Sequence, residues 1–392
     1  MSDSYSHAML HPTDATVLQA LHLPFGRAEA PCTPEKVAIA ARLIPAFKAA
    51  RARTPAAAAG NTPDLWTGIV AGNFAQMHDC IERGDAAQLA QWLSGFGGDY
   101  TWFGGLTTGV DGYSHWHAGD EKAVAYSYFD KLLCLAEAVG VLPAEDPEQG
   151  SAGNWGHNIR LQPQAVADAV ADHFRINIVP PGGIIPVAGL ALEEGLLHYR
   201  HLNGLYVAGR IRDLTRPADR ICEYGGGLGF VAYYLCLLGR RDVTLFDLPV
   251  TNLLSGFFLI SALGHEAVCL EGEPQRPGTI KIRSGWACVD MPAKHFSLYA
   301  NVDSFPEISV DIVRFYLQQI ERHTSDYFFH VNQEVEQAVT NVVEHERVPR
   351  LVAQETAMTR LYRAPYWLRR GYVEELYRMP VRGWRSLLGG RF

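Results

Sequence analysis

The sequence predicts an α/β fold in which a doubly wound, mostly parallel sheet follows a mainly helical N-terminal region. Two observations lead to this expectation. From about residue 220, short apolar segments alternate with segments of helical period, which is typical of a parallel sheet covered by helices. Before about residue 190, the apolar side chains recur mainly at helical spacing. We therefore expect a helical domain over residues 1–190 and an α/β domain over residues 191–392.

The helices of the first half are marked by their capping residues. Residues 33–35 read T-P-E, an N-cap followed by a proline and an acid in the first turn. Pro45 is expected to kink or end the helix that follows. Asp85 can cap a short helix, and Asp120 can cap a longer one that Gly140 closes.

The second half predicts five strands with helices between them. The strands are expected at residues 221–224, 242–248, 266–270, 296–302 and 326–331. Two helices are expected to end near residues 238 and 263, and a third is expected over residues 305–322. The residues expected on the buried side of this third helix are Ile308, Ile312, Phe315 and Ile320.

Composition and charge exclude several classes of protein. The 392 residues carry a formal net charge of −8, so a nucleic-acid partner, which usually requires a basic face, is not expected. The seven cysteines include no C-x-x-C pair, which favours free thiols in a reducing compartment. The most apolar run, residues 253–263, is too short to span a bilayer, and no secretory leader is visible. We therefore expect a cytoplasmic protein without membrane insertion, and a homo-oligomer is compatible with the sequence.

A glycine-rich loop follows the first expected strand, where residues 221–229 read I-C-E-Y-G-G-G-L-G. The G-x-G-x-x-G pattern of dinucleotide sites needs a third glycine for close packing of helix and strand, but that position holds Phe230. The pattern of S-adenosylmethionine-dependent methyltransferases is acidic-x-G-x-G-x-G. It is matched at every position by Glu223, Gly225, Gly227 and Gly229. A plain tight turn is disfavoured, because so many glycines cost backbone entropy.

We therefore expect S-adenosyl-L-methionine as the cofactor. The glycines, Gly226 among them, would let the backbone pass close to the amino-acid tail of a cofactor that has no pyrophosphate. Glu223 would interact with the amino group of this tail, directly or through water. At the end of the second strand, Asp247 can accept hydrogen bonds from the ribose hydroxyls, and Leu248 can lie against the adenine. An acid at this place also occurs in NAD enzymes, so only the glycine pattern distinguishes the two cofactors.

Four motifs resemble a single family. They are E-Y-G-G-G-L-G-F-V-A-Y-Y-L at residues 223–235, F-D-L-P at 246–249, N-V-D-S-F-P-E-I at 301–308 and F-F-H-V-N at 328–332. Together they are similar to the bacterial sugar O-methyltransferase family, with a fainter match at residues 374–378, E-E-L-Y-R. The resemblance implies a Rossmann-like class I methyltransferase fold. It also implies methyl transfer to a hydroxyl of a sugar or glycoside, such as a nucleotide- or lipid-linked glycan precursor.

Three alternatives remain beside this interpretation. The F-D-L-P motif also resembles small-molecule O-methyltransferases of phenolic or polyketide metabolites, although Val302, Asp303 and Ser304 replace their H-D-W stretch. An NAD-dependent oxidoreductase is disfavoured by the failed third glycine position. A non-catalytic cofactor-binding interaction protein is disfavoured because such a protein would have little need of both Glu223 and Asp247.

A hydroxyl acceptor calls for a general base beyond the carboxyl ends of the strands, where open α/β sheets bind their ligands. His330, near the end of the fifth strand, is the first candidate. Its alternative is a buried histidine satisfied by its neighbours. Asp303, directly after the fourth strand, is the second candidate, and its alternative is a solvated loop acid.

Residues 304–307 have two interpretations. They read S-F-P-E, which has the spacing of a capping box and places a proline in the first helical turn. This interpretation explains Ser304 and Glu307 without any substrate, and we favour it. A catalytic or acceptor-binding role for Glu307 stays open, because the start of this helix lies at the mouth of the expected cleft.

Aromatic and polar residues are mixed in two segments of the N-terminal half. Residues 100–103 read Y-T-W-F and residues 113–117 read Y-S-H-W-H. Aromatic faces stacked on sugar rings are common in sugar sites, so we expect the small-molecule or glycan acceptor to be recognised by this helical domain. The H-x-H pair lacks matching carboxylates or cysteines, and no metal site is expected.

Overall fold

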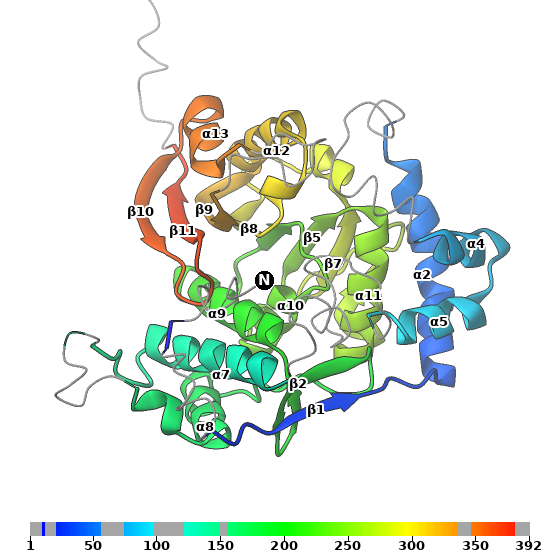
Figure 1. The fold of residues 1–392 in the computed structure, drawn as a ribbon. Helices are drawn as coiled ribbons and strands as arrows, with labels where there is room; N and C mark the ends of the chain where they lie inside the picture. Colours follow the sequence, from blue (N-terminus) through cyan, green and yellow to red (C-terminus); the bar gives the residue numbers. More distant parts are fainter. Residues whose placement is uncertain are drawn as a thin grey trace, which may run out of the picture.

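The computed structural model describes residues 10–11, 21–55, 74–97, 121–146, 148, 156–334 and 346–380, with an eight-stranded sheet at its centre (Figure 1). The strands lie in the order β10-β11-β9-β8-β4-β5-β7-β6. Their bounds are Ile221–Tyr224 (β4), Val243–Asp247 (β5), Val268–Cys269 (β6), Ile280–Ser284 (β7), Phe296–Val302 (β8), Thr324–Gln333 (β9), Thr359–Pro365 (β10) and Tyr372–Arg378 (β11). Strands β4 to β9 pair in parallel, and β11 is antiparallel to β9 and β10. The expected doubly wound, mostly parallel sheet is confirmed.

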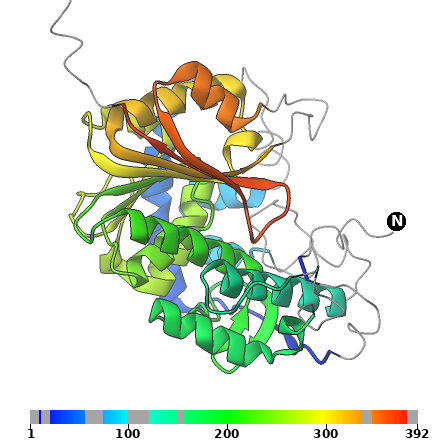
Figure 2. The same cartoon turned by 90° about the vertical axis from the view of Figure 1, so that its left-hand side faces the viewer.

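Helices cover both faces of this sheet, as Figure 2 shows. One face packs against α9 (Tyr199–Leu214), α10 (Phe230–Leu237) and α11 (Pro249–Leu263), in the larger apolar core. The other face packs against α12 (Val310–His323) and α13 (Val348–Glu355), in a second core. Strand β4 has β5 on one side and β8 on the other, so the chain reverses its direction of winding there. Ligands of doubly wound sheets bind at such a switch point, beyond the carboxyl ends of the strands.

The N-terminal helices pack against α9 and α11, the helices that cover one face of the sheet. Helix α2 (Pro34–Ala52) lies against α11, α5 (Ala86–Ser94) packs on α2, and α4 (Ala75–Arg83) packs on α5 (Figure 1). Helix α7 (Glu121–Ala138) packs against α8 (Pro163–Phe174) and α9. A small antiparallel sheet joins β1 (Phe25–Ala28), β2 (Val187–Leu192) and β3 (Gly195–Leu197).

The boundary expected between residues 190 and 191 lies inside strand β2. Residues from both expected domains contribute to the same apolar core, from Ile39 on α2 to Leu376 on β11. The side chain of Leu43 comes so close to Gly256 on α11 that a Cβ atom there would lie 2.6 Å from it. Helix α2 is therefore part of the layer that covers the sheet.

Several capping predictions for the N-terminal helices are confirmed. The Thr33 hydroxyl accepts a hydrogen bond from the backbone N–H of residue 36, and the Asp85 carboxylate accepts one from residue 88. Of the two outcomes expected at Pro45, a kink or an end, the end is wrong, because α2 runs through Pro45 to residue 52. Buried neighbours such as Leu43 and Phe47 hold the helix in place across the missing hydrogen bond.

Two elements of the second half differ from expectation. The third strand, β6, is only two residues long, and the neighbour of β5 is instead β7, which reads I-K-I-R-S and was not expected. The helix expected over residues 305–322 is divided into a 3-10 turn, Phe305–Glu307, and α12. The buried side of α12 consists of Val313, Leu317, Ile320 and His323, so Ile320 is buried as expected, whereas Ile308, Ile312 and Phe315 are only partly buried.

Within the described part of the chain, no helix is both long enough and apolar enough to cross a membrane.

Candidate functional site

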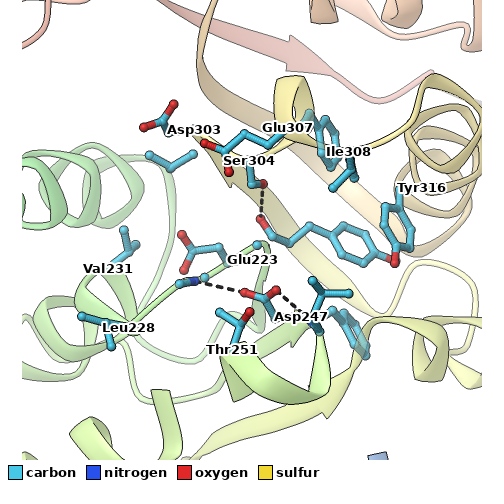
Figure 3. A pocket seen from close by; sticks show the side chains of 18 of the residues that line it. Glu223, Leu228, Val231, Asp247, Thr251, Asp303, Ser304, Glu307, Ile308 and Tyr316 are labelled. Carbon is cyan, nitrogen blue, oxygen red and sulfur yellow. Dashed lines mark hydrogen bonds between the residues drawn. The ribbon is translucent and has the colours of Figure 1, made fainter. Parts of the chain in front are cut away.

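A cavity of about 210 Å³ lies at the carboxyl ends of β4, β5 and β8, at the switch point of the sheet. The glycine loop after β4 forms one wall, and α9 forms another. The end of β8, the 3-10 turn Phe305–Glu307 and the start of α12 complete it. Figure 3 shows the carboxylates of Glu223, Asp247, Asp303 and Glu307 among the side chains that line this space.

The glycine loop adopts a backbone that only glycine accommodates easily. Its φ angles are +71° at Gly225, +58° at Gly227 and +85° at Gly229, in the region that side chains disfavour. A Cβ atom at Gly225 would lie 2.1 Å from the hydroxyl oxygen of Ser304. A Cβ atom at Gly229 would lie 2.7 Å from Leu259 on α11. The loop therefore brings bare backbone to the cavity wall and packs α10 closely on α11.

Six of the seven residues predicted to bind cofactor line this cavity. They are Glu223, Gly225, Gly226, Gly227, Asp247 and Leu248. Gly229 is not among the lining residues, because its place is at the start of α10, against Leu259. Its role in this structure is packing.

Glu223 is a buried carboxylate without a full set of partners. It is 2% exposed, and its Oε2 atom has no hydrogen-bond partner in the protein. Burial, with a smaller contribution from the nearby charge of Asp247, raises the pKa of Glu223 to about 8. A carboxylate in this position is stabilised in its charged form only if a cation or a hydrogen-bond donor enters the cavity.

Asp247, at the end of β5, is held by the backbone of the loop. Its Oδ2 accepts a hydrogen bond from the N–H of Gly227 at 3.1 Å, and its Oδ1 accepts one from the N–H of Leu248 at 2.7 Å (Figure 3). Burial raises the pKa of Asp247 to about 6, although these bonds and one from Thr251 oppose the rise. The carboxylate is thus fixed at the floor of the cavity.

Asp303 and Glu307 both line the cavity, as expected of catalytic candidates. Asp303 has a φ angle of +52°, a conformation that non-glycine residues adopt at a cost and that is common at functional sites. It is not a solvated loop acid, because its carboxylate pairs with Arg369 and with Arg200, the latter at 3.4 Å. Asp303 is therefore held in place by two guanidinium groups.

His330, the first candidate for the general base, does not line the cavity. Its side chain is completely buried between β8 and β11, on the sheet face that α12 and α13 cover. The Nε2 atom lies 3.0 Å from Glu375 Oε2, and Nδ1 lies 3.3 Å from Asn332 Nδ2. The alternative of a buried histidine satisfied by its neighbours is the one that the structure supports, because no acceptor can reach this ring.

The capping box proposed for residues 304–307 is also corrected. The side chain of Ser304 makes no capping hydrogen bond to the turn that follows. Its Oγ instead lies 2.5 Å from Asn301 Nδ2 and 3.4 Å from the carbonyl of Tyr224. Ser304 therefore faces the glycine loop and belongs to the cavity wall.

Sequence reasoning missed the wall contributed by α9. Arg200, Asn203 and Gly204 line the cavity from this helix, which was not expected because its apolar and polar residues show little separation into faces. Asn203 accepts a hydrogen bond through Oδ1 from the hydroxyl of Tyr366, so its amide hydrogens are left for other partners.

Two aromatic side chains of the cavity wall were also not expected from the sequence. Trp286 follows β7, and Tyr316 lies on α12. Their rings approach each other, with centroids 6.3 Å apart, and Tyr316 stacks on Tyr224. Trp286 could have been predicted only if β7 had been recognised as a strand. The lysine and the arginine that alternate with its isoleucines make β7 look unlike a core strand.

The two aromatic segments at residues 100–103 and 113–117 lie outside the described residues. Within the described part of the chain, one buried group could hold a metal ion: His11, Asp130 and Cys134. The ring of His11 already contacts Asp130 at 2.8 Å and Glu137 at 2.9 Å, and Lys131 contacts Asp130 at 2.7 Å. These ion pairs anchor the segment at residues 10–11 to α7, and the group is not part of the cavity wall.

Comparison with known proteins gives matches of fold only. The sequence matches no protein-family model and no curated protein. Similar solved structures include the [4+2]-cyclase SpnF (10% identity, 45% of this chain and 82% of that one, TM-score 0.36). They also include a SAM-dependent methyltransferase from Aquifex aeolicus (11% identity, 45% and 89%, TM-score 0.32). A third is the glycopeptide N-methyltransferase MtfA complexed with S-adenosyl-L-homocysteine (14% identity, 45% and 90%, TM-score 0.34). At such identities and TM-scores, these structures indicate nothing about the activity or the substrate of this chain.

Proposed function

We propose that this chain is an S-adenosyl-L-methionine-dependent O-methyltransferase. The observation that carries the proposal is Glu223, a buried carboxylate with one oxygen unsatisfied, beside a loop of bare glycine backbone. The amino group of the cofactor's methionine tail is the cation that would satisfy it. A pyrophosphate would instead bring negative charge to this carboxylate, so a dinucleotide suits the site poorly.

The rest of the cavity suits the remaining parts of the same cofactor. Asp247 has a second lone pair on each oxygen with which to accept hydrogen bonds from ribose hydroxyls. Trp286, Tyr316 and Leu248 offer an apolar and aromatic surface for adenine. In the proposed step, the acceptor oxygen forms a bond to the methyl carbon while the bond from that carbon to sulfur breaks. S-adenosyl-L-homocysteine then leaves.

The acceptor is proposed to be a hydroxyl of a sugar or glycoside. Supporting this, the wall near Asp303 alternates donors and acceptors: the guanidinium of Arg200, the amide of Asn203 and the carboxylates of Asp303 and Glu307. Polyhydroxylated molecules both donate and accept hydrogen bonds, whereas a phenol offers a single hydroxyl. We propose Glu307 as the general base that takes the hydroxyl proton, because its carboxylate lines the cavity at the 3-10 turn after β8, whereas His330 is outside the cavity.

Two measurements test this proposal. Calorimetry with S-adenosyl-L-homocysteine should give saturable binding, and NAD should give none; the reverse result would overturn the cofactor assignment. Transfer of a tritiated methyl group should then be measured across UDP-glucose, methyl glucosides and simple phenols. Label in the phenols alone would replace the sugar acceptor with the phenolic alternative.

A further inference from the structure

A row of buried polar side chains crosses the sheet behind the cavity. Strand pairing places Glu375 of β11 opposite His330 of β9, His330 opposite Asn301 of β8, and Asn301 opposite Tyr224 of β4. The side chains of Glu375, His330 and Asn301 are 0% exposed, and that of the neighbouring Asn332 is 1% exposed. Buried polar groups usually satisfy one another, and these four side chains do so except at Asn332 Oδ1, which has no partner among the described residues.

The direction of these bonds is fixed by a backbone carbonyl. The Nδ2 atom of Asn301 lies 3.0 Å from the carbonyl oxygen of Tyr224, which can only accept. Asn301 therefore turns its amide nitrogen toward β4 and its Oδ1 toward β9. That Oδ1 must receive a donor, and Asn332 supplies one through Nδ2 at 2.8 Å.

The same reasoning assigns the tautomer of His330. Because Asn332 presents Nδ2 to the ring, the Nδ1 atom of His330, 3.3 Å away, must accept. The ring proton therefore sits on Nε2 and is donated to Glu375 Oε2 at 3.0 Å. Burial opposes the charge of Glu375, but hydrogen bonds from His330 and Tyr377 outweigh it and lower the pKa of Glu375 to about 2. Glu375 is thus an ionised acceptor, as this chain of bonds requires.

At the other end, the row reaches the cavity through Ser304. The second Nδ2 hydrogen of Asn301 is donated to Ser304 Oγ at 2.5 Å. The hydroxyl hydrogen of Ser304 is then left to donate, and the protein acceptor recorded for it, the carbonyl of Tyr224, is 3.4 Å away. That distance is longer than the roughly 2.5–3.0 Å usual for hydroxyl donors. Ser304 lines the cavity (Figure 3), and its Oγ would lie 2.1 Å from a Cβ atom at Gly225.

We propose that His330 is a positioning residue for the cofactor site. Acting through the two asparagines, it holds the Ser304 hydroxyl as a hydrogen-bond donor toward the ligand beside Gly225. The carboxylate of the cofactor's amino-acid tail is the acceptor that this donor suits, so the inference rests on the proposed function. Residues at the edge of the sheet, including Arg360 and Arg363, which bind Glu375, are thereby connected to the glycine loop.

A matched pair of variants separates the two ring nitrogens of His330. His330→Asn keeps an acceptor near the position of Nδ1, whereas His330→Gln keeps a donor near the position of Nε2. Affinity for S-adenosyl-L-homocysteine, measured by calorimetry, should stay within about twofold in His330→Asn and fall about five- to tenfold in His330→Gln. An equal loss in both variants, or a larger loss in His330→Asn, would contradict the assignment.

A double-mutant cycle distinguishes positioning from a general loss of structure. Ser304→Ala should weaken S-adenosyl-L-homocysteine binding about tenfold, because a hydrogen bond to a charged group is lost. His330→Gln should then cause no further loss when it is added to Ser304→Ala. If His330→Gln lowers the affinity equally with and without Ser304, or if Ser304→Ala has no effect, the proposed positioning role is wrong.

Nitrogen-15 NMR of histidine-labelled protein tests the chain of bonds without any ligand. The His330 signals, identified by their loss in His330→Asn, should show a protonated Nε2 and a bare Nδ1. A protonated Nδ1 would overturn the inference even if the cofactor binds. If the wild-type protein shows the expected tautomer but does not bind S-adenosyl-L-homocysteine, the proposed function fails while the bonding direction stands, and the link to the cofactor is rejected with it.

Discussion

The two sides of the cavity differ in whether their buried carboxylates have partners in the protein. On the side of the glycine loop, Glu223 is buried with one oxygen unsatisfied, and its pKa is raised to about 8. On the side of β8, Asp303 is paired with Arg200 and Arg369. An unsatisfied buried carboxylate costs stability until a ligand arrives, whereas a paired one holds its surroundings together. The difference indicates which acid is arranged for a ligand and which is part of the framework.

The largest effect is expected at Glu307, the third acid of the cavity. Glu307→Gln should lower kcat about 10²–10⁴-fold, because the amide cannot take the acceptor's proton. Affinity for S-adenosyl-L-homocysteine should remain within about twofold, since the cofactor side is unchanged. Steady-state kinetics and calorimetry measure the two quantities. Asp311→Asn, at an exposed acid on the same segment, is the control and should alter neither.

Removing the unsatisfied carboxylate should affect binding and stability in opposite directions. Glu223→Gln should weaken S-adenosyl-L-homocysteine binding about 10–100-fold, because a charged hydrogen bond to the ammonium group is lost. The ligand-free variant should melt at a higher temperature than the wild type, because an uncompensated buried acid has been replaced by a neutral amide. Glu266→Gln, at a highly exposed glutamate, provides the control. A variant that binds normally would show that Glu223 has another purpose.

Removing the paired carboxylate should have the opposite effect on stability. Asp303→Asn should lower the free energy of unfolding by about 1–3 kcal/mol, because two guanidinium groups lose a charged partner. Denaturant unfolding measures this loss. Cofactor affinity should change less than in Glu223→Gln. If both variants shift stability in the same direction, the contrast between the two sides of the cavity is not real.

The raised pKa of Glu223 also predicts how binding depends on pH. Below about pH 8 the ligand-free carboxyl is protonated, and it must lose this proton to bind an ammonium group. Affinity for S-adenosyl-L-homocysteine should therefore rise with pH by at most about tenfold per unit and level off near pH 8. The contribution of Glu223 to the free energy of unfolding changes with pH in the opposite direction to ligand affinity. It is present at low pH and is lost as pH rises through about 8, because the folded state binds this proton more tightly than the unfolded state.

Calorimetry in two buffers of different ionisation enthalpy measures this linkage directly. At pH 7 the wild type should release close to one proton on binding, and Glu223→Gln should release fewer. The pKa of Asp247 is raised to about 6. Below pH 7, the Glu223→Gln variant should therefore still release some protons on binding, and these come from Asp247. Identical heats in both buffers for the wild type would contradict the linkage.

The cofactor side of the cavity was more predictable from the sequence than the acceptor side, for a physical reason. The loop after β4 needs glycine at Gly225 and Gly227 because its φ angles are positive, and such a requirement is visible in the residues themselves. The acid at the end of β5 is likewise fixed by its place in a strand. By contrast, Arg200 and Asn203 reach the cavity only because α9 packs beside α10, which no local pattern records.

The error at His330 has a similar origin. Alternation along β9 correctly groups Phe328, His330 and Asn332 on one face, but it does not say which face looks toward the cavity. Likewise, the S-x-x-E spacing predicts a cap at Ser304, but the Ser304 hydroxyl instead accepts a hydrogen bond from Nδ2 of Asn301 on β8. In both cases contacts between strands outweigh the local signal.

The smallest predicted effect concerns the acceptor side alone. The hydroxyl of Tyr366, in the turn between β10 and β11, donates to Oδ1 of Asn203 and so keeps the amide hydrogens toward the cavity. Tyr366→Phe removes one neutral hydrogen bond, so KM for the acceptor found in the tritium screen should rise about two- to tenfold. Affinity for S-adenosyl-L-homocysteine should not change, because Asn203 lies on α9 and not on the glycine loop or β5, to which we assign the cofactor contacts. A change in cofactor affinity with an unchanged acceptor KM would instead assign α9 to the cofactor and move the acceptor to another wall.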